Sequence, residues 1–313
     1  MALGNHSTIP EFILLGLSAD LYVLALLFVL FLGIYILTLM GNLMMLLVVR
    51  ADSQLHTPMY YFPSHLSFLD ISFSSAIIPK LLEYLQSQRK TISVGGCLTQ
   101  VFFMFECGDT EACLLSVMAY HHYVAICHPL LYGQMMSNQF CKGLVWGSWS
   151  LGFLGALINT LLPMNLDFSW EDSIPHYSCE LPSFFPLSCL EITTNFIVLL
   201  CSSLLHGIGT CFLTVYSYTP IISTILSISS SAGRSTASSC FSRLTIVLLF
   251  YGSASLCCLL PASGSSLELT FSLQYSVSTP LVNPLIDSLK NNQVKGAVCR
   301  TLRKYLQCIR QLA

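Results

Sequence analysis

Acidic side chains inside long apolar stretches are the residues of this sequence that are most able to carry chemistry. Asp70 lies within the apolar stretch Pro58–Leu82. If that stretch crosses a lipid bilayer, an unpaired carboxylate there is costly, so such an acid is by default a candidate functional group. We expect Asn42 and Asn283, which lie in two other apolar stretches, to be its partners. Two roles are open for Asp70: a functional site, or a protonated acid that only stabilises packing.

Three further acids lie close together within the stretch Cys97–Cys127. Glu106 and Asp109 are three residues apart and therefore share a helix face, whereas Glu111 points elsewhere. Each of these side chains could face a ligand cavity or simply reach polar neighbours. The sequence alone favours neither role.

Histidines and a cysteine near the end of the same stretch raise the question of a metal site. Ligands on one helix face must be three or four residues apart, and most pairs among His121, His122, Cys127 and His128 miss this spacing. The 14 cysteines contain no CxxC pair, and no GxSxG, phosphate-cradling or HExxH motif is present. We therefore predict no metal site, no cofactor and no enzyme.

The composition places these residues in a membrane protein. Hydrophobic residues make up 54% of the 313 residues and charged residues only 9%, whereas soluble domains average about 25% charged. The sequence also lacks the strongly basic character of a protein that binds nucleic acid. A membrane-spanning helix needs about 20 mostly apolar residues. The stretches that qualify are Leu21–Val49, Pro58–Leu82, Cys97–Cys127, Gly143–Leu162, Phe196–Ile225, Leu244–Leu260 and Leu269–Leu289. We therefore predict an all-α membrane protein, a seven-transmembrane-helix bundle.

Seven spans place the two termini on opposite sides of the membrane, and the basic residues indicate which side is which. If the N-terminus is outside the cell, the inner segments hold ten of the 13 lysines and arginines, in agreement with the positive-inside rule. These ten are Arg50, Lys142, Arg234, Arg243, Lys290, Lys295, Arg300, Arg303, Lys304 and Arg310. We therefore expect an extracellular N-terminus and a cytoplasmic C-terminus.

This arrangement divides the chain into an extracellular N-terminus (1–20), a seven-helix transmembrane domain (21–289) and a cytoplasmic segment (290–313). In the last segment, basic residues alternate with apolar ones at helical spacing, which is typical of a short amphipathic helix on anionic membrane lipid. A frayed basic tail is the alternative. Asn5 begins an Asn-His-Ser triplet, a glycosylation acceptor if the N-terminus is extracellular.

Several short motifs are spread over nearly the whole chain. They are Gly41-Asn42, Pro58-Met59-Tyr60, Leu66-Ser67-Phe68-Leu69-Asp70, Met118 to Tyr132, Ser217-Tyr218, Phe250-Tyr251-Gly252 and Pro280 to Asn291. Together they resemble the motifs of olfactory receptors, a branch of the rhodopsin-like G-protein-coupled receptors, from roughly Glu11 to Val298. The resemblance implies a plasma-membrane receptor that binds a small volatile odorant and signals through a stimulatory heterotrimeric G protein of the olfactory type.

The resemblance also assigns roles to individual residues. It implies a disulfide between Cys97 and Cys179, and a free Cys189 because Ser169 stands where a partner cysteine is usual. It favours a structural role for Glu111. The residues that it places in a mostly apolar ligand cavity are Met104, Phe105, Gly108, Asp109, Ser202, Ser203, His206, Tyr251, Ala254 and Cys258. Plain helix packing is the alternative for each of these. The residues that it places in an activation network are Asn42, Asp70, His121, His122, Tyr123, Tyr218, Asn283, Pro284 and Asp287.

The sequence departs from the family pattern at its expected cytoplasmic side. His121-His122 stands where the family has Asp-Arg, and Asp287 replaces the tyrosine of Asn-Pro-x-x-Tyr. The segment that begins at Thr236 also lacks a family lysine. Histidine is shorter than arginine and only partly charged near neutral pH. We favour a signalling odorant receptor; a receptor-like protein with impaired coupling is the alternative. A transporter or channel is a third hypothesis, which the lack of an internal repeat disfavours.

Overall fold

The structure is a computed structural model of the chain. It describes residues 11–14, 20–87, 90–162, 173–174, 177–179, 193–227, 244–245, 247–253, 266–290, 293–301 and 303. In chain order its elements are β1 (Glu11–Leu14), α1 (Leu21–Ala51), a 3-10 turn (Ser53–Leu55), α2 (Pro58–Gln86), β2 (Thr91–Ser93), α3 (Val94–Cys127), α4 (Tyr132–Met135), α5 (Asn138–Leu161), β3 (Ser173–Ile174), α6 (Thr193–Ser227), α8 (Ser266–Leu273), a π-helix (Gln274–Ser278) and α9 (Thr279–Lys290). Residues 247–253 and 293–301 are helical as well.

Each predicted membrane span coincides with helical structure wherever the chain is described. The helices α1 and α2 begin at the predicted residues, Leu21 and Pro58, whereas other helix ends differ from the predicted ones. One reason is capping by polar side chains. The Ser93 side chain accepts a hydrogen bond from the Gly96 amide, so α3 begins three residues before the predicted start at Cys97. By length and composition, three of the described helices could cross a membrane on their own: α1, α5 and residues 197–225 of α6.

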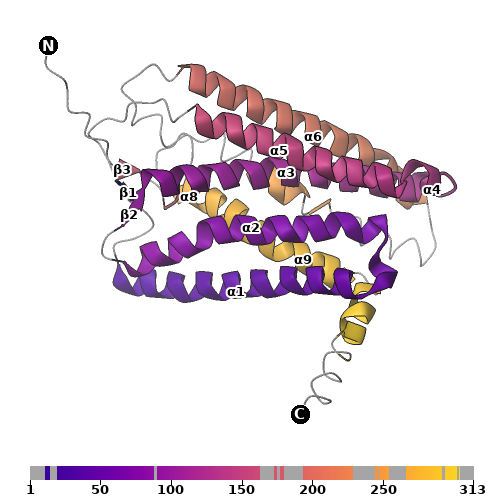
Figure 1. The fold of residues 1–313 in the computed structure, drawn as a ribbon, viewed down its shortest axis with the longest axis horizontal. Helices are drawn as coiled ribbons and strands as arrows, with labels where there is room; N and C mark the ends of the chain where they lie inside the picture. The colour runs from indigo at the N-terminus through magenta and orange to yellow at the C-terminus, as the bar shows by residue number, and fades with distance from the viewer. Residues whose placement is uncertain are drawn as a thin grey trace, which may run out of the picture.

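The third helix, α3, lies at the centre of the bundle. It packs against α2 on one side and against α5 and α6 on the other, while α1 packs against α2 and α9 (Figure 1). Residues 110–119 of α3 are all buried, which requires neighbours around the whole circumference of the helix. This central position brings the acids of α3 into contact with several other helices.

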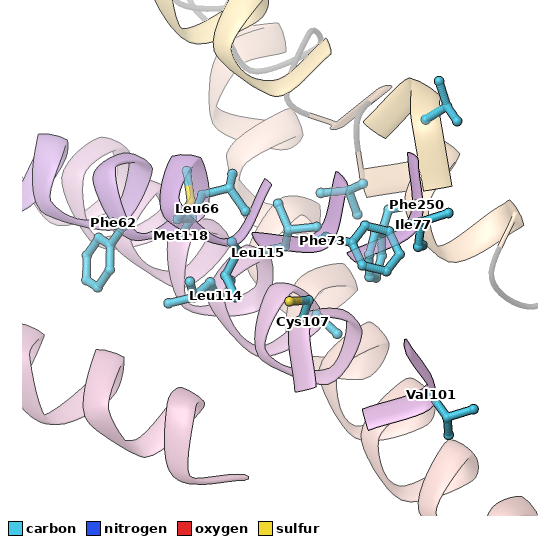
Figure 2. Packing of buried hydrophobic residues seen from close by; sticks show 14 of the residues in the cluster. Phe62, Leu66, Phe73, Ile77, Val101, Cys107, Leu114, Leu115, Met118 and Phe250 are labelled. Atoms are coloured by element: carbon cyan, nitrogen blue, oxygen red, sulfur yellow. The ribbon is translucent and has the colours of Figure 1, made fainter. Parts of the chain in front are cut away.

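Apolar side chains of α2 and α3 form the middle of the main core (Figure 2). Phe62 and Phe73 of α2 are 1% and 2% exposed, and Leu114 of α3 is fully buried. Phe250, from helical residues 247–253, packs into the same cluster. This core holds the polar residues of α2 and α3 away from water.

A small sheet, which the sequence analysis did not predict, covers one end of the bundle (Figure 1). Its strand order is β2-β1-β3, so β1 is the central strand. Phe12 of β1 lies opposite Ile92 of β2 in an antiparallel pair, and Leu14 lies opposite Ile174 of β3 in a parallel pair. Phe12, Leu14 and Ile174 are at most 1% exposed, so burial of apolar side chains stabilises these short strands.

The seventh predicted span, Leu269–Leu289, is not one regular α-helix. The structure divides it into α8, a π-helical turn over Gln274–Ser278, and α9. Pro280 and Pro284 lie in α9, and neither has an N–H to donate to the carbonyl four residues earlier. The carbonyl groups released in this way need donors from elsewhere in the bundle.

The helical residues 293–301 pack against the end of the bundle opposite the sheet (Figure 1). Val294 and Ala297 are 1% and 0% exposed and contact a small cluster from α1 and α2. Arg300 donates to Oδ2 of Asp52 through Nε at 2.9 Å and through one terminal nitrogen at 2.6 Å. The hydroxyl of Tyr60 donates to the Gln293 side chain at 2.6 Å. This segment is therefore an ordered, docked helix.

Candidate functional site

Asn283 of α9 joins two buried acids, one from α2 and one from α3. Its Nδ2 lies 3.0 and 3.2 Å from the two carboxylate oxygens of Asp70 and 3.2 Å from Oε1 of Glu111. All three residues are at most 2% exposed. Two ionised carboxylates this close repel each other away from water, so the arrangement is most stable when the pair holds one proton and carries a single negative charge. The predicted contact of Asp70 with Asn283 is present, and Glu111 belongs to the same cluster.

Asn42, the second predicted partner of Asp70, directs its side-chain amide elsewhere. Its Nδ2 donates to the carbonyl oxygens of Thr38 and Pro280, each at 3.0 Å. The Pro280 carbonyl is available because Pro284, four residues later, has no N–H to offer it. Gly41 allows this close approach, since a Cβ there would lie 3.2 Å from the Pro284 ring. The prediction for Asn42 is therefore corrected: it joins α1 to α9.

A second polar pair, Asp109 of α3 and His206 of α6, lies beside α5. Oδ2 of Asp109 is 3.6 Å from Nδ1 of His206, and the two side chains are 18% and 14% exposed. The same Nδ1 is 3.1 Å from the carbonyl oxygen of Ser202, which can only accept, so this nitrogen carries a proton. A Cβ on Gly155 of α5 would lie 2.5 Å from Oδ2 of Asp109 and 3.3 Å from the His206 ring, so a larger residue there would displace the pair. Three helices therefore meet at this point.

An asparagine that the sequence analysis missed lies next to this pair. Asn159 of α5 is 1% exposed, and its Nδ2 donates to the carbonyl of Gly155 at 2.9 Å and to the Ser202 hydroxyl at 3.0 Å. Its signal in the sequence was an amide inside an otherwise apolar span. Together with Asp109 and His206 it gives this part of the bundle a compact group of hydrogen-bonding side chains.

The other residues expected in a ligand cavity are placed as follows. Met104 and Phe105 are partly buried against the main core. The Tyr251 hydroxyl donates to the Ala112 carbonyl of α3 at 3.2 Å. Gly108 lies against the hydroxyl of Tyr275, a residue that the sequence analysis did not single out. Ser203 is half-buried in α6, and Ala254 and Cys258 lie outside the described residues.

The end of α3 that carries the family departures contacts α4 and α2. His121 is 2% exposed, its Nε2 is 2.7 Å from the Tyr132 hydroxyl, and its ring lies edge-on to Phe62 at 5.6 Å between centroids. Burial raises the pKa of Tyr132, so its hydroxyl stays protonated near neutral pH. The Tyr123 hydroxyl lies 2.9 Å from Nε2 of His128. The histidine that replaces the family aspartate therefore holds α4 against the bundle.

Several remaining predicted residues divide between described and undescribed parts of the chain. Tyr218 is buried, and His122 is half-buried with its ring 5.5 Å from that of His121. Within the part of the chain that the structure describes, no group of three His, Cys, Asp or Glu side chains could hold a metal ion. The remaining predicted residues lie outside the described part of the chain: Asn5, Ser169, Cys189, Thr236 and the side chain of Asp287.

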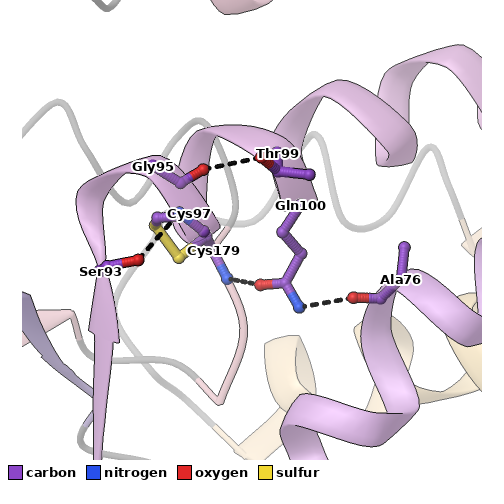
Figure 3. The surroundings of a disulfide bond; sticks show 8 residues. Ala76, Ser93, Gly95, Cys97, Thr99, Gln100 and Cys179 are labelled. Carbon is purple, nitrogen blue, oxygen red and sulfur yellow. Dashed lines mark hydrogen bonds between the residues drawn. A yellow bond between two sulfur atoms is a disulfide. The ribbon is translucent and has the colours of Figure 1, made fainter.

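The disulfide between Cys97 and Cys179, which the resemblance implied, is present (Figure 3). It joins α3 to the loop that follows β3. Beside it, the Gln100 side chain accepts from the Cys179 amide at 2.9 Å and donates to the Ala76 carbonyl of α2 at 3.2 Å. The loop is thus fixed to two helices at one point. Neither the sequence pattern nor the family motifs indicated the role of Gln100.

Comparisons with known proteins agree with this arrangement. The model of the olfactory receptor family matches residues 31–305. Olfactory receptor 8S1 of Homo sapiens is 64% identical over 97% of this chain and 84% of its own length. Olfactory receptor 8A1 of Homo sapiens is 44% identical over 97% and 94%, and the olfactory receptor-like protein OLF3 of Canis lupus familiaris is 42% identical over 95% of each chain. The chain therefore belongs to the olfactory receptor family: it is a seven-transmembrane G-protein-coupled receptor, a multi-pass plasma-membrane protein and not an enzyme.

Proposed function

We propose that this receptor binds a small, volatile, mostly apolar odorant inside the helix bundle and signals through a stimulatory heterotrimeric G protein. The observation that carries this proposal is the pair Asp109–His206 at the junction of α3, α5 and α6. A mostly apolar cavity needs a few polar groups to orient its ligand. The pair offers a carboxylate acceptor beside an imidazole, within an otherwise apolar bundle.

The ligand in this proposal lies between α3, α6, helical residues 247–253 and α8. Odorants with a hydrogen-bond donor suit the site best, because Oδ2 of Asp109 is buried and accepts no hydrogen bond among the described residues. An alcohol or a phenol could donate to this oxygen and still place its apolar part against Met104 and Phe105. A purely apolar molecule would leave the carboxylate without a donor, at a cost of about 1–3 kcal/mol.

Signal transfer in this proposal runs through the buried pair Asp70–Glu111. The amide of Asn283 connects α9 to both acids, and Asn42 connects α1 to α9. A ligand that favours one arrangement of these helices shifts the population towards it. The G protein then binds near His121, His122 and the docked helix 293–301.

The same proposal includes a topology of the chain in the membrane. Residues 1–20 are extracellular with a sugar on Asn5, residues 21–289 span the membrane, and residues 290–313 are cytoplasmic. Lys295 on the docked helix and Arg303 just beyond it are exposed, and both can contact anionic lipid. The small sheet then faces the extracellular side.

The test is an odorant panel, rich in alcohols and phenols, applied to cells that display the tagged receptor, with cAMP and surface display measured together. A ligand-dependent rise in cAMP is expected. Asp109→Ala and His206→Ala should raise the EC50 at least about tenfold, which corresponds to roughly 1.4 kcal/mol. Gly207→Ala, in open space on α6, is the matched control and should leave the EC50 unchanged.

Two results would count against the proposal. An EC50 that is unchanged in both Asp109→Ala and His206→Ala would remove the polar pair from the ligand site. Good display with no response to the whole panel would argue against signalling by this chain. If His122→Arg together with Asp287→Tyr then restored a response, the receptor-like protein with impaired coupling would replace our proposal.

A further inference from the structure

Tyr275 lies in the irregular part of the seventh span. Residues Gln274–Ser278 form a π-helical turn, which holds more residues per turn than an α-helix and therefore changes the direction of its side chains. Such turns occur frequently at functional sites. The Tyr275 ring lies 5.3 Å from that of Phe73 in α2 and 5.5 Å from that of Phe250, between centroids. Tyr275 therefore lies between two other elements of the bundle, α2 and helical residues 247–253.

The hydroxyl end of Tyr275 reaches a third element, α3, at Gly108. A Cβ added to Gly108 would overlap the Tyr275 hydroxyl oxygen and would lie 3.7 Å from the ring carbon that bears it. Gly108 therefore forms a notch that holds the phenol. Because glycine is unfavourable inside a helix by about 0.8–1.0 kcal/mol relative to alanine, a packing reason for it is expected, and this contact supplies one.

The notch lies next to the acid pair along the same two helices. Gly108 and Glu111 are three residues apart on α3 and share a face. Tyr275 precedes Asn283 by eight residues in the seventh span, and Asn283 contacts Glu111 at 3.2 Å. The contact Tyr275–Gly108 and the contact Asn283–Glu111 are thus successive contacts between α3 and the seventh span. A change in the first must be transmitted to the second if the helices between them stay rigid.

We propose that Tyr275 is a positioning residue: by seating its hydroxyl on Gly108 it sets the separation of α3 and the seventh span, and through this the geometry of the pair Asp70–Glu111. The inference rests on the odorant-receptor function proposed above. A ligand next to Gly108 acts on the acid pair through Tyr275, without touching the acids. Tyr275 therefore contributes to the coupling between the ligand and the acid pair, and not to ligand affinity alone.

The test uses purified receptor in nanodiscs and needs neither odorant nor G protein. Infrared bands of the buried carboxyl groups are assigned with Asp70→Asn and Glu111→Gln. Gly108→Ala should shift these bands, because the added methyl group displaces the phenol. Tyr275→Phe introduced into the same chain should return the bands towards their original positions, because it removes the atom that the methyl group meets. Gly33→Ala, in open space on α1, should leave them unchanged.

A folded Gly108→Ala protein with unshifted bands would overturn the inference, and so would a double variant that keeps the shift. If Gly108→Ala alone does not fold, the double variant must fold and Tyr275→Ala must shift the bands; failure of either also overturns it. In cells, Gly108→Ala should change the odorant EC50 about tenfold, within the usual range of coupling between sites. A wild-type receptor that is silent to odorants but shows the expected shifts would contradict the proposed function and not this inference.

Discussion

Gly152→Ala tests the closest approach of α5 to the central helix α3. An added Cβ would lie 2.8 Å from the carbonyl oxygen of Glu106 and 3.0 Å from the backbone nitrogen of Thr110, and it would overlap the Thr110 hydroxyl. The first two are main-chain atoms of α3, which cannot rotate away. The two helices must therefore move apart by roughly 0.5 Å to recover ordinary van der Waals contact.

The expected loss of stability follows from two opposing effects. Overpacking of this kind costs about 1–3 kcal/mol. Replacing glycine by alanine in a helix interior regains about 0.8–1.0 kcal/mol. The net loss for Gly152→Ala is then about 0–2 kcal/mol. Gly147 lies on the same helix with no atom within 4 Å of an added Cβ, so Gly147→Ala has only the gain and is the matched control.

The measurement is thermal unfolding of the purified receptor in detergent micelles, followed by tryptophan fluorescence. Trp149 of α5 lies near both substitutions in sequence and reports on this helix. Gly152→Ala should lower the unfolding midpoint by several degrees, and Gly147→Ala should leave it unchanged or raise it slightly. If Gly152→Ala unfolds at the same temperature as Gly147→Ala, α3 and α5 do not approach as described, and the reasoning is refuted.

Three further predictions concern contacts between distant parts of the chain. Asn42→Ala should cost about 1–3 kcal/mol, because it leaves the Pro280 carbonyl buried without its donor; equal unfolding midpoints for wild type and Asn42→Ala would contradict this. Cys97→Ser should sharply reduce surface display of the receptor, measured by antibody labelling of intact cells, because it frees the loop from α3; wild-type display would contradict it. Asp52→Arg should weaken docking of the helix 293–301, and adding Arg300→Asp should restore it, as measured by amide exchange in that helix; identical exchange in both variants would exclude the ion pair as a clasp.

The helical spans could be predicted from composition, because a helix that crosses a bilayer needs about 20 mostly apolar residues. Few other structures contain apolar stretches of this length. The starts of α1 and α2 could be predicted as well, but those of α3 and α5 could not, because they depend on single capping side chains, Ser93 and Ser137. The π-helical turn at Gln274–Ser278 was also beyond prediction. It depends on which neighbours Tyr275 finds in three dimensions, and hydrophobic periodicity carries no information about this.

The polar contacts were partly predictable. Asp70 and Asn283 stood out because hydrophilic side chains in apolar spans must find each other. Asn42 was assigned the wrong partner because the sequence shows that Pro284 lacks an N–H but not which donor reaches the carbonyl it leaves free. Asn159 and Tyr275 were missed because a lone amide or phenol in a span is as easily a packing residue as a functional one.

The position of β1 in the small sheet has a consequence for the synthesis of the protein. This strand leaves the ribosome first, yet both of its neighbours come later: β2 after two helices and β3 after α5. Until then its N–H and C=O groups, and the apolar side chains of Phe12 and Leu14, have no sheet to join. Contacts between residues so far apart in sequence form late and slowly. During synthesis, the apolar side chains and unpaired backbone groups of β1 therefore stay exposed for a long interval. Chaperones bind surfaces of this kind, which favours retention of the protein before export.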